Sequence, residues 1–282
     1  MNAASSSAAV ASSWTTALSA ATADSISIRG YDLADLVGTV PFPSVVYLLF
    51  TGELPDPATA RLIDAVMVAS IDHGAGTPSV LAARTAISGG ATLPAAAAAG
   101  MLAFGESHGA AVEPAMTLIA IVVDRAGSRG GVDLEPVADE VVAEWRDAGR
   151  RMPGYGHRQH KGRDPRLDAI LSIAHDTGVA GRHVAAALAI EASLRRALGR
   201  PVPINIDGTL AAILGDVGFP SDLGNALFIA ARVSGILAHA NEERRTMPAM
   251  RRIDPVDHGY DGPPSRQLSA ATAGSMETGG QR

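Results

Sequence analysis

The stretch MPGYGHRQHKGRDPR, residues 152–166, stands apart from the chain on both sides of it. It contains two histidines, four cations and two prolines, whereas its flanks consist mainly of Ala, Val, Leu and Ile. Gly154 and Gly156 allow the backbone to approach a ligand closely, and His157 follows them directly. The pattern predicts a polar loop between apolar helices.

This loop ends where a helix begins. Asp164-Pro165 is an N-cap residue followed by proline at the first helical position. Arg166 then lies in the first turn, where a cation opposes the helix dipole at a cost of about 0.3–1 kcal/mol. A bound anion would reverse that sign. Residues 150–166 hold six cations and one acid, which indicates either a site for a polyanionic small molecule or a solvated surface loop.

Outside the loop, the spacing of apolar residues is helical almost throughout. Val137, Val141 and Trp145 form a stripe at i, i+4 and i+8, and Asp56-Pro57 marks another helix start. Only Ser25–Arg29 alternates like a strand. The sequence therefore predicts an all-α fold with one short hairpin near the N-terminus. The expected helices include 56–72, 94–104, 135–148, 164–174, 180–198, 208–215 and 221–243.

Composition narrows the class of protein. With 282 residues, of which 47% are hydrophobic and 18% charged, the chain suits one large globular domain or two modest ones. A net charge of −6 argues against a general nucleic-acid binder, and the lack of cysteine excludes disulfides and thiolate nucleophiles. The first 23 residues do not resemble a secretory signal, and the run Pro94–Phe104 is too short to cross a bilayer. We therefore expect a cytoplasmic protein outside the membrane.

Three further polar islands interrupt apolar stretches: IDHG (71–74), GESHG (105–109) and NIDG (205–208). Taken singly, His73, His108 and Asp207 could each be a helix cap or a satisfied core residue. Together with the basic loop they indicate proton transfer rather than catalysis by a covalent nucleophile. His73, His108 and His157 could also ligate zinc, but no H-x-x-x-H pair lies on one helix face, so we expect no metal site.

These motifs together resemble the citrate synthase superfamily. The stretches similar to its N-terminal signature are RGYDLADL (29–36) and VVYLLFTGELP (45–55). Those similar to its three catalytic segments, in order, are GESHGAA (105–111), PGYGHRQHKGRDPR (153–166) and NIDG (205–208). The resemblance covers about residues 24–262. It implies a citrate synthase-like fold, with a large and a smaller helical domain and the active site in the cleft between them.

A domain division follows from the resemblance and from Gly127–Gly131, which separates an Ala-rich region from a charged helix. We expect a large helical domain from 24–111 and 222–263, and a small helical domain from 112–221. Residues 1–23 and 264–282 are expected to be flexible.

Three short sequence motifs favour one branch of the superfamily. The stretches that resemble citryl-CoA lyases and the lyase module of ATP citrate lyase are IDHGAGTPS (71–79), NIDG (205–208) and YDGP (260–263). The chain is also short for a full citrate synthase. We therefore predict an enzyme that cleaves citryl-CoA, or a related 3-hydroxy-acyl-CoA, to acetyl-CoA and oxaloacetate. The alternatives are a citrate or methylcitrate synthase, and a non-catalytic CoA-binding paralogue.

The resemblance implies three catalytic roles. His108 would hold the thioester oxygen as the acetyl-CoA enol forms. His157 would exchange a proton with the tertiary hydroxyl of citryl-CoA. Asp207 would act as base or acid at the acetyl carbon. Electrostatic stabilisation of an enolate oxygen is often the largest catalytic contribution, and each positioned acid or base adds roughly 10²–10⁴-fold.

The resemblance also implies binding positions and partners. The residues that match carboxylate-gripping positions are His73, Arg166 and Arg232. The residues expected against CoA are Pro153, Gly154, Tyr155, Gly156, Lys161 and Asn205. The CoA thioester is a substrate, so no separate cofactor is expected. The partners would be the CoA thioester, an oxaloacetate-like oxo acid and a second copy of the chain, joined through helices 94–104 and 221–240.

The chain departs from the family pattern at one position that concerns substrate binding. The family often places an arginine directly before a proline in its C-terminal segment, where it reaches the substrate across a dimer. Here Asp254 precedes Pro255, with Arg251 and Arg252 nearby. The departure affects the third carboxylate contact, and with it the choice of acyl substrate.

Overall fold

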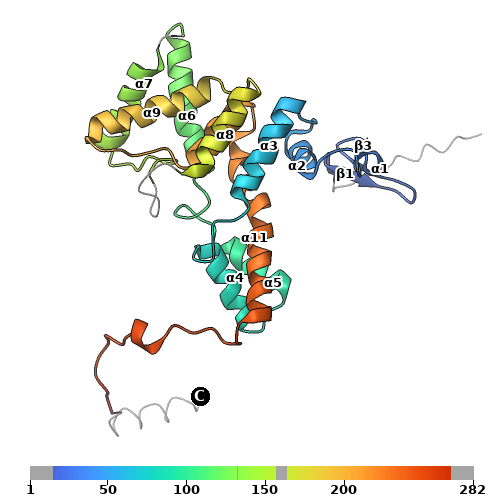
Figure 1. Ribbon diagram of the computed structural model, residues 1–282, viewed down its shortest axis with the longest axis vertical. Helices are drawn as coiled ribbons and strands as arrows, with labels where there is room; N and C mark the ends of the chain where they lie inside the picture. The colour runs from blue at the N-terminus through green and yellow to red at the C-terminus, as the bar shows by residue number, and fades with distance from the viewer. Residues whose placement is uncertain (1–14, 132, 157–163, 268–282) are drawn as a thin grey trace, which may run out of the picture.

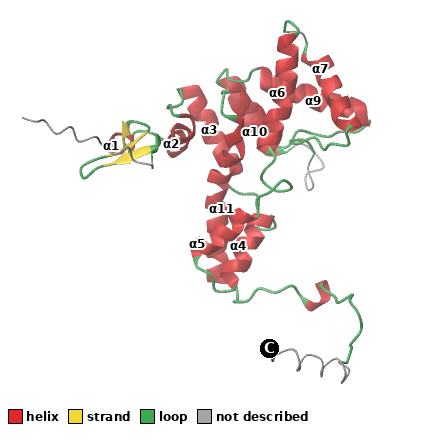
Figure 2. Cartoon of the chain, turned by 180° about the vertical axis from the view of Figure 1, so that it is seen from behind, coloured by secondary structure: helices red, strands yellow, loops and turns green. Residues whose placement is uncertain are grey.

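The computed structural model describes residues 15–131, 133–156 and 164–267, which are helical almost throughout (Figures 1 and 2). This confirms the all-α fold class. The helices are α1 (Leu33–Leu36), α2 (Phe42–Thr51), α3 (Pro57–Ser70), α4 (Pro78–Ser88), α5 (Leu93–Leu102), α6 (Val112–Ser128), α7 (Leu134–Asp147), α8 (Pro165–Asp176), α9 (Arg182–Leu198), α10 (Ile206–Asp216) and α11 (Gly224–Thr246), with 3₁₀ turns η1 (Ser221–Leu223) and η2 (Pro255–Asp257).

The strand predicted at Ser25–Arg29 is the middle of a small antiparallel sheet. Its strands are β1 (Ser19–Ala21), β2 (Ile26–Ile28) and β3 (Tyr31–Asp32), in the order β1-β2-β3. The sheet lies beside α1 and α2 at one end of the molecule (Figure 1). The Arg29 side chain donates two hydrogen bonds to the Leu49 carbonyl of α2, at 2.7 and 3.2 Å, which join the sheet to the helices.

Side-chain caps set the predicted helix starts. The Asp56 carboxylate accepts hydrogen bonds from the amides of Ala58 (2.8 Å) and Thr59 (3.0 Å), and α3 begins at the proline that follows. The Asp164 carboxylate accepts from the Arg166 amide at 3.0 Å, and α8 again begins at a proline. Both carboxylates satisfy amides that no helical carbonyl can reach.

The helices bury two apolar cores. The larger joins α3 and α6–α10 with the first half of α11, and Leu62, Leu118 and Ile190 are fully buried in it. The smaller lies between α4, α5 and the second half of α11 (Figure 2) and contains Val80 and Ile236. The two cores are separate clusters of buried side chains, so each must be held in place relative to the other.

Helix α11 makes that connection. Its residues Leu227 and Phe228 lie in the larger core, and Ile236 and Ala240 lie in the smaller one. It begins at Gly224, three residues after the predicted start, because Ser221–Leu223 form the turn η1. The segment 221–246 is long and apolar enough to cross a membrane by length and composition alone. A core helix passes the same test, and α11 packs on α3, α4, α5 and α6.

The predicted domain boundaries stay a prediction. The larger core takes Leu62 from the segment expected in the large domain and Leu118 from the segment expected in the small one. The buried clusters therefore do not divide at residue 111, and the division between α4, α5 and the remaining helices is the one that core packing shows.

Asp216, at the end of α10, caps another helix from a distance. Its carboxylate accepts hydrogen bonds from the amides of Gly181 (2.7 Å), His183 (2.8 Å) and Val184 (3.0 Å) at the start of α9, and from the His183 ring at 3.0 Å. Burial acts to raise the pKa of Asp216, but the four hydrogen bonds outweigh it and hold the pKa below its usual value of 3.8. One ionised side chain thus joins the end of α10 to the start of α9.

We predict that Asp216→Ala lowers the free energy of unfolding by about 2 kcal/mol, the upper range for a lost helix cap. Because the folded pKa is depressed, this stabilisation is fully present above the unfolded pKa and is lost as pH falls through the folded pKa. Urea unfolding of wild type and variant at pH 7 and at pH 3 checks this. A difference that stays constant between the two pH values would contradict the ionised cap.

Candidate active site

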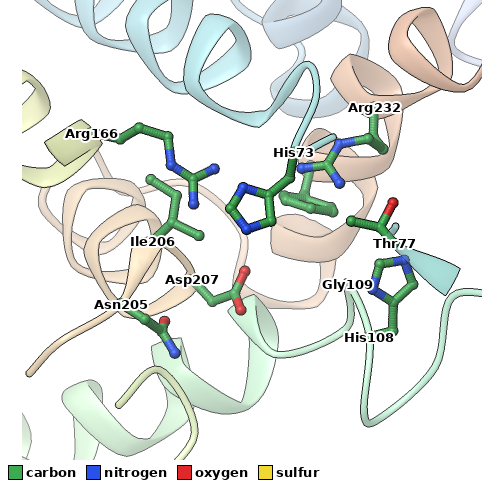
Figure 3. Close-up of a pocket in the computed structure, with 10 residues that line it drawn as sticks. His73, Thr77, His108, Gly109, Arg166, Asn205, Ile206, Asp207 and Arg232 are labelled. Carbon is green, nitrogen blue, oxygen red and sulfur yellow. The ribbon is translucent and has the colours of Figure 1, made fainter. Parts of the chain in front are cut away.

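One pocket, of about 120 Å³, lies where five segments of the chain meet (Figure 3). The segments are the loop after α3, the loop after α5, and the helices α8, α10 and α11. The lining residues are His73, Thr77, His108, Gly109, Arg166, Asn205, Ile206, Asp207, Phe228 and Arg232. Six of the predicted site residues are among them: His73, His108, Arg166, Asn205, Asp207 and Arg232. His157 and Lys161 lie outside the described residues.

Arg166 reaches the pocket while held by the cap of its own helix. Its Nε and Nη2 atoms donate to the two oxygens of Asp164 at 3.0 and 2.6 Å, and Nη1 donates to the Ala69 carbonyl at 3.1 Å. The Asp164 side chain is 3% exposed, so this ion pair is shielded from solvent on the carboxylate side. Asp164 thus offsets the conflict between the Arg166 cation and the helix dipole, and fixes the guanidinium at the pocket wall.

Arg232 supplies a second, more deeply buried cation. It is 2% exposed, its Nε donates to the Ser70 carbonyl at 2.6 Å, and its guanidinium carbon lies 4.7 Å from the centre of the Phe228 ring. Burial lowers the pKa of Arg232, although an arginine stays protonated under ordinary conditions. Two guanidinium groups at one pocket suit a ligand with two carboxylates.

Asp207 lies in the first turn of α10, and Figure 3 shows its carboxyl pointing toward His73 and Arg166. Burial raises the pKa of Asp207, against the opposing effect of the Arg166 and Arg232 charges. A carboxyl with a raised pKa holds a proton nearer to neutral pH, so it suits transfer of a proton to or from carbon.

His108 is held in one tautomer by the start of α4. Its Nε2 lies 2.9 Å from the Ser79 hydroxyl and 3.3 Å from the Ser79 amide, and its ring stacks on Phe104 at 5.3 Å. A backbone N–H can only donate, so Nε2 accepts and the proton of the neutral ring lies on Nδ1. Burial lowers the pKa of His108, and the charges of Arg232 and His73 lower it further. The ring is therefore a neutral donor.

The predicted CoA segment 153–156 lies outside the pocket lining and contacts the residues just before α10. The Gly156 amide donates to the Pro203 carbonyl at 2.7 Å, and the Asn205 amide donates to the Gly154 carbonyl at 2.9 Å. A Cβ on Gly208 would collide with the Gly154 carbonyl, so the two glycines let the segments cross. The crossing supports the first turn of α10, and with it Asp207.

Tyr155 and Asn205 are engaged within this crossing. The buried Tyr155 hydroxyl donates to the Ala187 carbonyl at 2.9 Å. The Asn205 side chain accepts from the Gly208 amide at 3.1 Å and donates to the Gly156 carbonyl at 2.9 Å. Pro153, Gly154 and Gly156 flank them. The CoA-binding role of these residues stays a prediction.

Sequence reasoning missed part of the site. Thr77, Gly109, Ile206 and Phe228 line the pocket, and Ser79 holds His108 from outside it. The available signal for Ser79 was Thr77-Pro78, a cap-then-proline pattern whose following amides lack helical acceptors. Among the described residues, no three His, Cys, Asp or Glu side chains gather as a metal site would require. The expectation of metal-free chemistry stays a prediction.

Comparison with known proteins gives one family. A sequence model described as the C-terminal domain of citrate synthase matches residues 55–253. A citryl-CoA lyase structure from Hydrogenobacter thermophilus is 36% identical, with a TM-score of 0.84, and the match covers 93% of this chain and all of that one. An ATP citrate lyase structure from Methanothrix soehngenii, 22% identical with a TM-score of 0.76 over 89% of this chain and 42% of that one, shares the fold.

A Mycobacterium tuberculosis protein, named provisionally as citrate synthase 2, is 31% identical over 196 residues. That match covers 68% of this chain and 49% of the relative, so the chain spans about half the length of the curated relative. The matches thus include a citryl-CoA lyase along its whole length and a synthase-like protein along half of its length.

The tautomer of His108 leads to a test that needs no substrate. We predict that the His108 ring is neutral at pH 7 with its proton on Nδ1, and that it titrates below the usual value of 6.5 because burial opposes its charge. Imidazole ¹⁵N chemical shifts followed from pH 8 to pH 5, assigned with a His108→Gln variant, measure both properties. A proton on Nε2, or titration at or above 6.5, would refute the arrangement.

Proposed function

Since the chain belongs to the citrate synthase family, we propose that it cleaves citryl-CoA, or a related 3-hydroxy-acyl-CoA, to acetyl-CoA and oxaloacetate. One observation carries the proposal. The half-buried carboxyl of Asp207 and the ring of His108 share a pocket with two guanidinium groups. The similarity to a citryl-CoA lyase along both chains supports this direction over synthesis.

The charges of the pocket suit the oxo-acid half of the substrate. Arg166 and Arg232 would each bind one carboxylate through charge-assisted hydrogen bonds, with His73 between them (Figure 3). Both guanidinium groups are already oriented by hydrogen bonds to the protein, from Arg166 to Asp164 and from Arg232 to the Ser70 carbonyl. Substrate binding would therefore lose little free energy to the ordering of these two side chains.

Cleavage requires a base for the tertiary hydroxyl and a stabiliser for the electron pair that leaves the broken C–C bond. The hydroxyl proton would go to His157, a role that rests on the sequence resemblance. As the hydroxyl carbon becomes a carbonyl, the electron pair forms the enolate of acetyl-CoA. The Nδ1–H of His108 would donate to the enolate oxygen, where a preorganised donor is most effective.

The reaction is completed by protonation at carbon. Asp207, as a carboxylic acid, would give its proton to the CH₂ of the enolate and so form the acetyl group, with the thioester intact. Burial raises the pKa of Asp207, which makes the protonated form more accessible at this step. In the direction of synthesis the same carboxylate would remove that proton.

Asp254, which stands where the family often has an arginine before the proline, bears on substrate choice. Arg251 precedes the Asp254-Pro255 pair, and its guanidinium binds the buried Glu243 carboxylate at 2.6 and 2.7 Å. It is therefore occupied within its own chain. A missing charge-assisted contact to a carboxylate is worth roughly 1.5–3 kcal/mol. We propose that substrates lacking one of the two carboxylates of citryl-CoA compete with it.

A citrate or methylcitrate synthase is the second candidate, favoured by the similarity to the mycobacterial relative. It would use the same proton-transfer groups and would also hydrolyse the thioester. We further propose a homodimer, since α5, one of the two helices expected at the interface, exposes the apolar side chains of Leu102 (86%) and Met101 (43%). Light scattering tests the dimer. The cytoplasmic location stays a prediction from the sequence.

We predict that Asp207→Asn keeps the fold and CoA binding but loses at least about 10²-fold in kcat for citryl-CoA, the scale of a lost acid–base group. Asparagine has the shape of the carboxyl without its proton chemistry. Steady-state kinetics, with circular dichroism and calorimetric CoA binding as controls, measure the effect. Unchanged turnover would remove Asp207 from the mechanism.

Product analysis separates the two reactions. We predict that citryl-CoA yields acetyl-CoA and oxaloacetate with little free CoA, because a lyase leaves the thioester intact. Mass spectrometry of the products, from citryl-CoA and separately from acetyl-CoA plus oxaloacetate, makes the measurement. Rapid formation of citrate and free CoA from the second mixture would establish a synthase. Binding of CoA without any turnover would leave a non-catalytic paralogue.

A further inference from the structure

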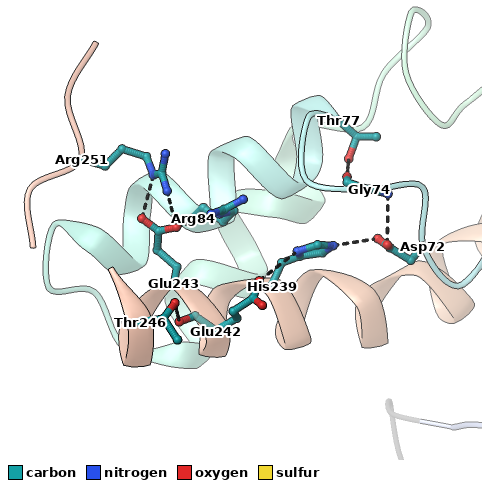
Figure 4. Close-up of polar contacts among 9 residues, drawn as sticks. All are labelled: Asp72, Gly74, Thr77, Arg84, His239, Glu242, Glu243, Thr246 and Arg251. Atoms are coloured by element: carbon teal, nitrogen blue, oxygen red, sulfur yellow. Dashed lines mark hydrogen bonds and ion pairs between the residues drawn. The ribbon is translucent and has the colours of Figure 1, made fainter. Parts of the chain in front are cut away.

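The three residues before His73 rest on three successive turns of α11. The Ser70 carbonyl accepts from the Arg232 Nε at 2.6 Å. The Ile71 carbonyl lies against Gly235, where a Cβ would collide with it. One turn further, an Asp72 oxygen lies 3.2 Å from the His239 Nε2 (Figure 4). The spacing 232, 235 and 239 is that of one helix face, so this segment is aligned along α11 residue by residue.

In the hydrogen bond between Asp72 and His239, the donor and the acceptor can be assigned. Burial acts to raise the pKa of Asp72, but hydrogen bonds from the Gly74 amide, at 3.0 Å, and from His239 outweigh it and lower the pKa. An ionised carboxylate only accepts, so the His239 Nε2 carries the hydrogen. The other ring nitrogen, Nδ1, lies 3.9 Å from the exposed Glu242. His239 is therefore the donor that holds the Asp72 carboxylate.

Two pocket residues follow Asp72 along the chain: His73 is the next residue, and Thr77 lies just before α4. Ser79, which is outside the pocket lining, lies in the first turn of α4. Ser79 is the residue that holds His108. A shift of Asp72 would thus move the backbone that carries His73 and that leads to the partner of His108. The Asp72 side chain is 38% exposed, so the contact adds little to overall stability.

We infer that His239 is a positioning residue: through Asp72 it fixes the loop that carries His73, and so sets the geometry with which the pocket grips the oxo acid. The inference rests on the proposed function for its kinetic consequence, and on the contacts alone for its structural one. His239 lies outside the pocket lining and is not a catalytic residue.

Three substitutions at one position test the contact. His239→Leu removes the donor. His239→Gln places an amide N–H where Nε2 was, and His239→Asn places it where Nδ1 was. We expect KM for citryl-CoA to rise roughly tenfold in the Leu and Asn variants, with a smaller change in kcat, because the grip acts on substrate and transition state alike. The Gln variant is expected to stay within about threefold of wild type.

The chain offers a matched control. His183 forms the same kind of pair with Asp216, at 3.0 Å. Asp216 lies nine residues after Asp207 on α10, about 14 Å along that helix, so this pair is remote from the pocket. His183→Leu is expected to lower the melting temperature at least as much as His239→Leu, on the order of 2–4 °C, yet to leave KM unchanged. Glu242→Gln, at the other ring nitrogen, is also expected to leave KM unchanged.

Hydrogen exchange supplies a readout that needs no activity. The Gly74 amide donates to Asp72, so exchange in residues 72–79 is expected to speed up in the Leu and Asn variants and to stay near wild type in the Gln variant. If wild type turns over no CoA substrate, the proposed function fails while exchange still decides the inference. Unchanged exchange in His239→Leu, or a raised KM in His183→Leu, would overturn it.

Discussion

The passage of α11 through both apolar cores is the constraint on which the site depends. Its first half lies in the core that α3 and α6–α10 also form, and its second half packs with α4 and α5. The pocket takes Arg232 from this helix, His73 from the loop that rests on it, and His108 from the loop after α5. Because this helix carries Arg232 and holds the segment that leads to His73, the distance between these two groups is set by helix geometry rather than by a flexible connection, while Ser79 of α4 holds His108. The buried side chains of α11 therefore determine the geometry of the chemistry.

Charge in the pocket is balanced by groups just outside it. Asp164 binds Arg166, the backbone carbonyl of Ser70 accepts from Arg232, and the charge of Asp72 stabilises the Arg232 cation. Without these partners, two guanidinium groups would repel one another and each would carry the cost of leaving water. With them, the cations are fixed before any ligand arrives. Burial favours the neutral forms of the two remaining groups: it raises the pKa of Asp207, against the opposing charges of Arg166 and Arg232, and lowers the pKa of His108.

Much of this could be predicted from local sequence. The Asp56 and Asp164 caps, each followed by proline, gave the correct starts of α3 and α8, because capping involves residues only two or three positions apart. The polar islands around His73, His108 and Asp207 do meet at one pocket. The contacts between Ser79 and His108, and between Asp72 and His239, could not be predicted in this way. They join residues 29 and 167 positions apart, and depend on how α4 and α11 pack. The sequence suggested an anionic ligand for Arg166, which does line the pocket, but not that Asp164, two residues away, would hold its guanidinium there.

The crossing of Gly154 and Gly208 has a consequence for redesign. Each glycine lies where the other's backbone would meet a side chain, since a Cβ on Gly154 would come within 2.7 Å of the Gly208 Cα. The loop before the basic segment and the first turn of α10 are thus one mechanical unit, although 54 positions separate the two glycines. A loop transplanted here from a relative would displace Asp207 unless it kept glycine at the crossing. Libraries that reshape the pocket are therefore best begun at Thr77, which lines it and belongs neither to this crossing nor to the two cores.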